Sequence, residues 1–299
     1  MITSFRQLIE EVKSARNRKI AVAVAQDVDV LEALHKAQQA DLADAILVGN
    51  KTQIEKIAKE NNIDLNNFEI IDEEDEAKAV QQSIQLIVNG QANLVMKGLC
   101  STATLMKAIL SRSSGLRESN LLSHLGIFEI SSYHKLIFMS DAALNIAPTL
   151  SEKIEITKNA ISIANRFGIS KPKVAMIAAV EKVNPDKMPA TVDAAAIAKM
   201  AERGQIKNAI IDGPLAVDNA FSKKSCEVKG IESEVGGDAD IAIVPEIETG
   251  NVFYKIMSYL AGAKTAGIII GAKVPIILTS RADSEETKFL SIASAAKVS

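Results

Sequence analysis

The chain has 299 residues, a formal net charge of −3, and 47% hydrophobic against 24% charged residues. This length suffices for two domains with a core each, and the composition is that of an ordinary globular protein. The weak negative charge offers no general attraction to nucleic acid, and the absence of tryptophan argues against base-stacking platforms.

The rarer residue types set further limits. Cys100 and Cys226 are too few for a disulfide framework or a zinc cluster. The histidines show no metal-ligand spacing; they are His35, His124 and His134. The opening MITSFRQLIEEVK predicts an amphipathic surface helix and not a signal peptide, because acidic residues interrupt its apolar positions. No apolar run approaches the roughly 18 residues of a membrane span, so we expect a cytoplasmic protein without membrane contact.

Short β-rich runs alternate with helical patterns in the first part of the chain. The strand candidates are residues 19–26, 44–50, 68–72 and 93–98. This alternation predicts βαβ units with a mainly parallel sheet. The acidic run 72–76 lies where carboxylates favour a helix N-terminus, so we interpret it as a solvated helix start.

The pattern then changes. Residues 123–130 and 135–141 are joined only by SSYH, which predicts an antiparallel hairpin, because parallel strands need a crossover of a dozen or more residues. A helix is expected to begin near Thr149 or Ser151. A second alternating series follows, with strand candidates at 173–181, 208–213 and 240–246.

The last β-rich runs bear on the domain boundaries. Residues 266–271 and 274–280 are separated only by Ala272 and Lys273, so they cannot be sequential parallel neighbours in one sheet. A hairpin, or a crossing back from a second domain to the first, explains so short a link. We predict two α/β domains with mainly parallel sheets flanking a cleft, the first of them discontinuous. Their expected bounds are 1–145 plus 275–299 and 146–274.

Four stretches combine a strand end, a polar or glycine turn and a helix start. They are residues 96–110, 212–222, 245–257 and 274–286. Each can present helix N–H groups to an anion. Equally, glycine and proline shape turns, and serine, threonine and aspartate cap helices. The candidate substrate-binding residues in these stretches are Lys97, Ser101, Thr102, Lys107, Gly250 and Asn251.

The stretch VPIILTSRADSEE (274–286) gives the clearest indication of an anion-binding site. Arg281 directly follows a buried strand, where a guanidinium can clamp phosphate or carboxylate with two hydrogen bonds. Ser280 offers a hydroxyl for a hydrogen bond to a charged group. Asp283 with Glu286 fits a capping box of the acidic kind. Cys100 lies in a possible anion loop without a histidine nearby in sequence, so we expect a buried small hydrophobe.

Cofactor fingerprints are missing, since the chain has no GxGxxG, Walker loop or HExxH motif. Instead, IIDGPLAVDNAFS (210–222) and GDADIAIVPEIETGNVFYKIMSYLAGAKTAGIIIGAKVPIILTSRADS (237–284) resemble the phosphate acetyl/butyryltransferase family. KVNPDKMPATVDA (182–194) and ILTSRADS (277–284) look specifically like its butyryltransferase branch. The resemblance covers essentially the whole chain and is strongest from about 170 to 290.

The resemblance implies a two-domain α/β fold related to the isocitrate and isopropylmalate dehydrogenase architecture. It implies reversible transfer of a short-chain acyl group, butyryl first, between coenzyme A and inorganic phosphate, with no metal or bound cofactor. Ser280 and Arg281 match the family's essential pair, which would hold the acyl phosphate and steady the charge at the reacting carbonyl. The resemblance also suggests a homodimer or a larger homo-oligomer.

Two positions depart from the acetyl branch. Its catalytic aspartate, seven residues after the serine, is Thr287 here. Asp283 is the nearest carboxylate, and it is either a general base or a helix cap. An arginine of the acetyl branch falls at Lys107, which keeps the charge but lacks the bidentate fork.

The chemistry favours direct transfer in a ternary complex, because holding both substrates in line can contribute about 7–11 kcal/mol. Cys100 is the only plausible rival nucleophile. Three alternatives remain: a phosphate acetyltransferase, a non-catalytic acyl-CoA-binding regulatory protein, and a metal- and NAD-dependent dehydrogenase, for which the sequence shows no carboxylate cluster. Acyl preference stays open, because one methylene in a hydrophobic pocket is worth only about 1–3 kcal/mol.

Overall fold

The computed structural model describes residues 1–13, 18–112, 114–280 and 282–299. The chain divides into two compact units. The middle unit contains residues 1–4 and 121–265, and the terminal unit contains residues 5–120 and 266–299. The predicted domain bounds, 1–145 plus 275–299 and 146–274, stay a prediction, because a domain must also be able to fold on its own.

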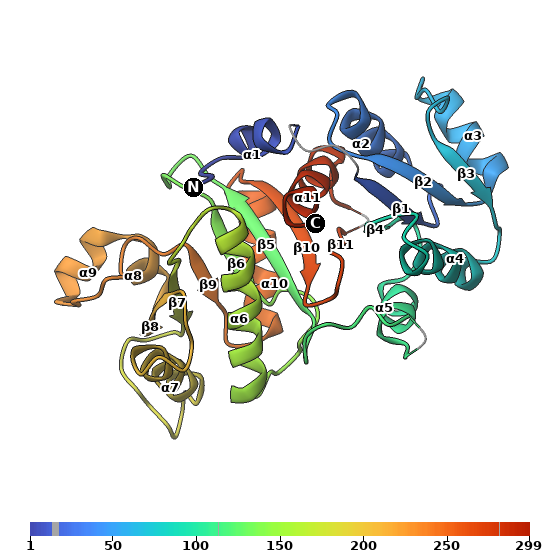
Figure 1. Cartoon of the computed structure of the whole chain (residues 1–299). Coiled ribbons are helices and arrows are strands. Elements are labelled where there is room, and N and C mark those ends of the chain that lie inside the picture. The colour runs from blue at the N-terminus through green and yellow to red at the C-terminus, as the bar shows by residue number, and fades with distance from the viewer. Residues whose placement is uncertain (14–17, 113, 281) are drawn as a thin grey trace. The chain divides into compact units, whose positions relative to one another are not determined.

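The terminal unit is a series of βαβ units around a mainly parallel sheet (Figure 1). Its strands are β1 (Lys19–Ala23), β2 (Asp44–Gly49), β3 (Glu69–Asp72), β4 (Leu94–Lys97), β11 (Ile276–Ile277) and β10 (Lys264–Ile270), whose first two residues belong to the middle unit. Its helices are α1 (Phe5–Val12), α2 (Val28–Gln39), α3 (Lys51–Glu60), α4 (Glu76–Val88), α5 (Thr102–Leu110) and α11 (Glu285–Val298). The strand order is β3-β2-β1-β4-β11-β10, and β10 runs antiparallel to β11 while the other neighbours are parallel.

Apolar runs and polar caps explain these elements. The strands β1, β2 and β4 are almost wholly buried, as expected of parallel strands covered by helices. Asp27, Asn50 and Asp75 cap α2, α3 and α4, each accepting the N–H of the residue three positions on. Asp75 belongs to the acidic run 72–76, which is mostly exposed, so its interpretation as a solvated helix start is confirmed.

The strands of the middle unit follow one another in the order β5-β6-β9-β7-β8 and are mixed in direction. Its strands are β5 (Ser123–Glu129), β6 (Ile137–Ser140), β7 (Lys173–Ile177), β8 (Ile210–Leu215) and β9 (Ile241–Ile243). Its helices are α6 (Leu150–Arg166), α7 (Ala190–Glu202), α8 (Val217–Phe221), α9 (Lys223–Lys229), α10 (Ile247–Lys255) and the π-helix η1 (Ile256–Leu260). Only the β5–β6 pair of these strands is antiparallel among the described residues.

Several sequence predictions are confirmed at this level. The chain is α/β with mainly parallel strands, and β5 and β6 form the predicted hairpin. Helix α6 starts as predicted, with Thr149 as its cap and Glu152 completing a capping box. For the last two runs the hairpin interpretation is correct, because Ile268 of β10 lies opposite Ile277 of β11 in antiparallel register.

Candidate active site

The candidate site lies at the carboxyl ends of β4 and β11 in the terminal unit. Ile277 of β11 pairs with Met96 of β4 in parallel, so the chain leaves the sheet at the same edge after both strands. Lys97 ends β4, and Ser280 follows the end of β11 by three residues. Open α/β sheets bind their ligands outside the carboxyl ends of their strands, which makes this edge the first place to look.

Ser280 is exposed and belongs to a loop closed by hydrogen bonds. Its N–H donates to Oδ2 of Asp283 at 2.7 Å, and its carbonyl oxygen accepts the N–H of Asp283 at 3.2 Å. The hydroxyl oxygen of Ser280 accepts the N–H of Ala282 at 3.4 Å. These bonds fix the backbone of Ser280 and keep its side chain at the surface.

The predicted acidic capping box at Asp283 is wrong. The N-cap of α11 is Ser284, whose hydroxyl accepts the N–H of Thr287 at 3.2 Å. Asp283 is 7% exposed and turns its carboxylate back to Ser280. Asp283 and Ser284 are both residue types that cap helices well. In this structure Asp283 bonds to the backbone of the loop, and Ser284 caps the helix. Arg281 lies outside the described residues.

The chain after β4 passes very close to the chain after β1. A Cβ atom on Gly98 would lie 2.1 Å from the carbonyl oxygen of Val24, so only glycine fits. Val24 itself has a left-handed φ of 62°. Beside this contact, Lys97 is 6% exposed, and its Nζ donates to the carbonyl of Gly98 at 3.0 Å. Lys97 is therefore a buried residue at the carboxyl edge of the sheet, where the site is predicted.

Cys100 is fully buried, as expected for a small hydrophobe. Burial raises the pKa of its thiol to about 11, against a smaller lowering by Lys97. Its Sγ lies 3.6 Å from the carbonyl oxygen of Ala23. A buried, protonated thiol is a poor nucleophile, because the thiolate is the reactive form.

Helix α5 begins at this edge with two of the predicted residues. Ser101 is its N-cap, and its hydroxyl accepts the N–H of Thr104 at 3.0 Å. Thr102 is its first residue. The N–H of Ser101 donates to Oε1 of Glu76 at 3.0 Å, a carboxylate that the sequence analysis did not single out. An anion bound at this helix start would therefore meet one negative charge already in place.

Lys107 lines a groove of about 680 Å³ between α4 and α5. The apolar part of its lining includes Val80, Ile84 and Val88 of α4. Lys107 is exposed and supplies a cation to the otherwise apolar or neutral polar lining. The groove suits an elongated molecule with apolar and anionic parts.

Gly250 and Asn251 lie on α10 of the middle unit, against the end of β6. A Cβ atom on Gly250 would lie 2.2 Å from the carbonyl oxygen of Asp141, so glycine lets the helix approach the strand end. The side-chain amide of Asn251 donates to the carbonyl of Ala142 at 3.4 Å. The structure therefore gives both residues a packing role, and their part in phosphate binding stays a prediction.

The start of α10 already carries a carboxylate. Glu246 is its N-cap and accepts the N–H groups of Glu248 at 2.7 Å and Thr249 at 2.9 Å, together with the Thr249 hydroxyl. Burial raises the pKa of Glu246, but these hydrogen bonds outweigh it and lower the pKa to about 2. A phosphate at this helix start would have to compete with that charge.

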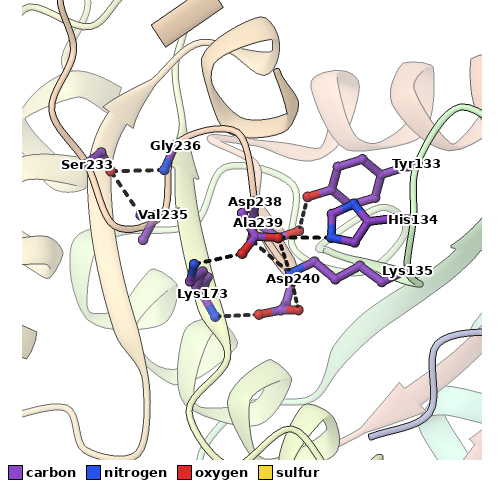
Figure 2. Close-up of polar contacts among 10 residues, drawn as sticks. All are labelled: Tyr133, His134, Lys135, Lys173, Ser233, Val235, Gly236, Asp238, Ala239 and Asp240. Carbon is purple, nitrogen blue, oxygen red and sulfur yellow. Dashed lines mark hydrogen bonds and ion pairs between the residues drawn. The ribbon is translucent and has the colours of Figure 1, made fainter. Parts of the chain in front are cut away.

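A polar cluster occupies the opposite edge of the middle unit's sheet, at the amino ends of β6, β7 and β9. Figure 2 shows Asp238 between His134, Lys135 and Lys173, with nitrogen–oxygen distances of 3.1, 2.9 and 2.7 Å. Lys135 also pairs with Asp240 at 2.8 Å. These contacts tie three strand ends together, so we assign the cluster to stability.

Among the residues that the structure describes, no group of three or more histidine, cysteine, aspartate or glutamate side chains is placed to hold a metal ion. Within the same residues, no helix has both the length and the apolar character needed to cross a membrane.

The sequence matches a family model and is similar to known acyltransferases over almost its whole length. The family model described as "Phosphate acetyl/butaryl transferase" matches residues 4–86 and 73–296. The chain is 48% identical to a phosphate butyryltransferase of Clostridium acetobutylicum, covering 100% of this chain and 99% of the relative. It is 41% identical to a phosphate acetyltransferase of Thermotoga maritima, covering 97% and 98%.

Solved structures agree in fold. A branched-chain phosphotransacylase from Enterococcus faecalis superposes with a TM-score of 0.84 at 34% identity, covering 94% of this chain and 98% of that one. A 4-hydroxythreonine-4-phosphate dehydrogenase from Klebsiella pneumoniae gives a TM-score of 0.57 at 10% identity, with coverages of 94% and 98%. The second likeness concerns the fold alone and confirms the dehydrogenase-like architecture.

Proposed function

Because the chain belongs to the phosphate acetyl/butyryl transferase family, we propose that it moves a short-chain acyl group reversibly between coenzyme A and inorganic phosphate. The family predicted from the C-terminal motifs is thus confirmed. Butyryl is the proposed acyl group, so the products are butyryl phosphate and coenzyme A. The observation that carries the proposal is the exposed Ser280 hydroxyl, on a loop closed by Asp283 at the carboxyl edge of the sheet.

In the forward direction a phosphate oxygen attacks the thioester carbonyl. The new C–O bond forms, the C–S bond breaks, and the sulfur leaves with the electron pair as a thiolate that then takes up a proton. Negative charge gathers on the carbonyl oxygen in between. Ser280 is proposed to donate to that oxygen or to orient the thiol, and Arg281 to neutralise the phosphate.

Further residues are proposed to bind the two substrates. Lys97, Ser101 and Thr102 are proposed to complete the phosphate side from β4 and α5, and Gly250 and Asn251 to help bind phosphate. Lys107 is proposed to hold an anionic group of coenzyme A, supported by its place in the groove between α4 and α5. Asp283 is proposed to act first by holding the Ser280 loop.

Transfer is proposed to be direct, within a ternary complex and without an acyl-enzyme. The buried Cys100, with a pKa of about 11, supports this. No metal or bound cofactor beyond the substrates is proposed. The proposed enzyme works in the cytoplasm as a homodimer or larger homo-oligomer.

The test is thiol release from butyryl-CoA, isobutyryl-CoA and acetyl-CoA by the purified protein, with and without phosphate. Phosphate-dependent release that is fastest with butyryl-CoA is the expected result. Preference for acetyl-CoA would favour the alternative of a phosphate acetyltransferase, and preference for isobutyryl-CoA a branched-chain substrate. No release, alongside tight acyl-CoA binding, would overturn the proposal in favour of a regulatory binding protein.

A further inference from the structure

Lys288 of α11 is a buried cation to which the proposed reaction gives no role. Lys288 is only 2% exposed to solvent. Its Nζ donates to the main-chain carbonyl of Asp283 at 2.5 Å and lies 3.7 Å from Oδ2 of Asp29. An ammonium taken out of water costs free energy unless it is hydrogen-bonded or paired. These two contacts therefore offset part of that cost.

The bond to Asp283 connects Lys288 to the loop that carries Ser280. Asp283 is held from two sides, because its carboxylate accepts the N–H of Ser280 and its carbonyl accepts from Lys288. Helix α11 packs against α2 (Figure 1). Asp29 stands in the first turn of α2. Lys288 thus fixes the end of the loop to two helices of the terminal unit.

A further charged contact joins the same two helices. Lys36 of α2 pairs with Glu285 of α11 at 2.6 Å. That pair joins the two helices, whereas Lys288 also donates to the main-chain carbonyl of Asp283 in the loop. Loss of Lys288 therefore removes the bond to the loop backbone while the Lys36–Glu285 pair between the helices stays in place.

We propose that Lys288 is a positioning residue, which holds the main chain at Asp283 and thereby sets the place of the Ser280 hydroxyl in the active site. This inference rests on the proposed function of Ser280. A displacement of about 1 Å in a reacting group can lower the rate about 100-fold. Because Lys288 is buried behind the loop, its loss changes kcat far more than the KM for either substrate.

The test compares Lys288→Met with Lys288→Gln and with a matched control, Lys297→Met. Lys297 lies on the same helix and pairs with Glu11 at 2.5 Å, so its replacement removes a charge of α11 without touching the loop. We expect kcat to fall about 10-fold to 100-fold in Lys288→Met, less in Lys288→Gln, and hardly at all in the control. KM for butyryl-CoA and phosphate should change by no more than about 3-fold.

Hydrogen exchange supplies a readout that does not depend on catalysis. Amides of a peptide covering residues 278–288 should exchange faster in both Lys288 variants, and the same peptide in Lys297→Met should match the wild-type protein. Wild-type kcat and exchange in a folded Lys288→Met protein would overturn the proposal, as would an equal loss of kcat in the control. If the methionine variant does not fold, the glutamine variant decides by the same criteria.

The experiment separates this inference from the proposed function. Absence of phosphate-dependent thiol release by the wild-type protein would remove the proposed function. The exchange measurement would then still decide whether Lys288 anchors the loop. Faster exchange at residues 278–288 in the Lys288 variants would confirm the anchoring, and unchanged exchange would overturn it.

Discussion

Asp283 and Ser280 hold each other across one turn of the chain: the carboxylate of Asp283 accepts the N–H of Ser280, and the carbonyl of Ser280 accepts the N–H of Asp283. A general base needs an oxygen aimed at the proton that it removes. Oδ2 of Asp283 is instead aimed at a backbone amide 2.7 Å away. The geometry therefore favours loop closure over proton transfer as the main task of Asp283.

This view gives a prediction for two substitutions of Asp283. Asparagine keeps an oxygen that can accept the N–H of Ser280, whereas alanine has none. We expect Asp283→Asn to keep kcat within about 10-fold of wild type and Asp283→Ala to lose about 100-fold or more. Steady-state kinetics across pH measures both. Equal losses in the two variants, with a lost ionisation in the kcat profile, would identify Asp283 as the base instead.

The predicted role of Arg281 depends on its planar fork of donors. Lysine keeps the charge but binds phosphate at one point, so Arg281→Lys should lower kcat/KM for phosphate by about 100-fold or more. Arg6→Lys is the matched control, because Arg6 is an exposed arginine of α1 that pairs with Glu10. Near-normal turnover of Arg281→Lys would remove Arg281 from the site.

Cys100 should be dispensable for catalysis. Its buried thiol has a pKa of about 11, so Cys100→Ala should keep kcat within about 2-fold and cost about 1 kcal/mol of the free energy of unfolding. Acyl transfer from labelled butyryl-CoA and denaturant unfolding measure the two effects. Trapped acyl-protein that disappears in Cys100→Ala would show a covalent intermediate and contradict direct transfer.

The polar cluster of Figure 2 predicts a stability change in acid. Burial raises the pKa of Asp238, but hydrogen bonds and charges of Lys173 and Lys135 outweigh it and lower the pKa to about 2. An aspartate in the unfolded chain has a pKa of about 3.9. The stabilisation is therefore complete above about pH 4 and is lost as the pH falls towards about 2. The Asp238 side chain is 40% exposed, so solvent screening keeps the contribution small.

Asp238→Asn should therefore lose less stability than the wild-type protein between pH 4 and pH 2. Asp186→Asn, which changes an exposed carboxylate in the loop after β7, is the control. Denaturant unfolding at each pH gives the comparison. Parallel stability curves for wild type and Asp238→Asn would show that the cluster does not couple folding to protons.

Much of the fold follows from local patterns in the sequence. The apolar runs 19–26, 44–50 and 93–98 contain β1, β2 and β4, because parallel strands are buried on both faces. The acidic run 72–76 contains Asp75, the N-cap of α4. The predicted place of the site rests on the same pattern and stays a prediction: Lys97 is the last residue of a buried strand, and Ser280 follows another by three residues.

The details of the site depend on contacts that local patterns do not reveal. Asp283 and Ser284 are both good helix caps, and only the hydrogen bond to Ser280 decides between them. Lysines are rarely buried, so nothing marked Lys288 among the small residues of α11. Glu76 and Ser101 stand 25 residues apart, and their hydrogen bond arises from the packing of α4 against α5.

Gly98 brings the chain after β4 into close backbone contact with Val24, which follows β1. Any side chain at position 98 would push against a backbone oxygen, which cannot swing aside as a side chain can. Such a push would shift Lys97 on one side and Ser101 on the other at the same time. One hydrogen atom in place of a methyl group therefore keeps two candidate substrate-binding residues in register with the neighbouring strand.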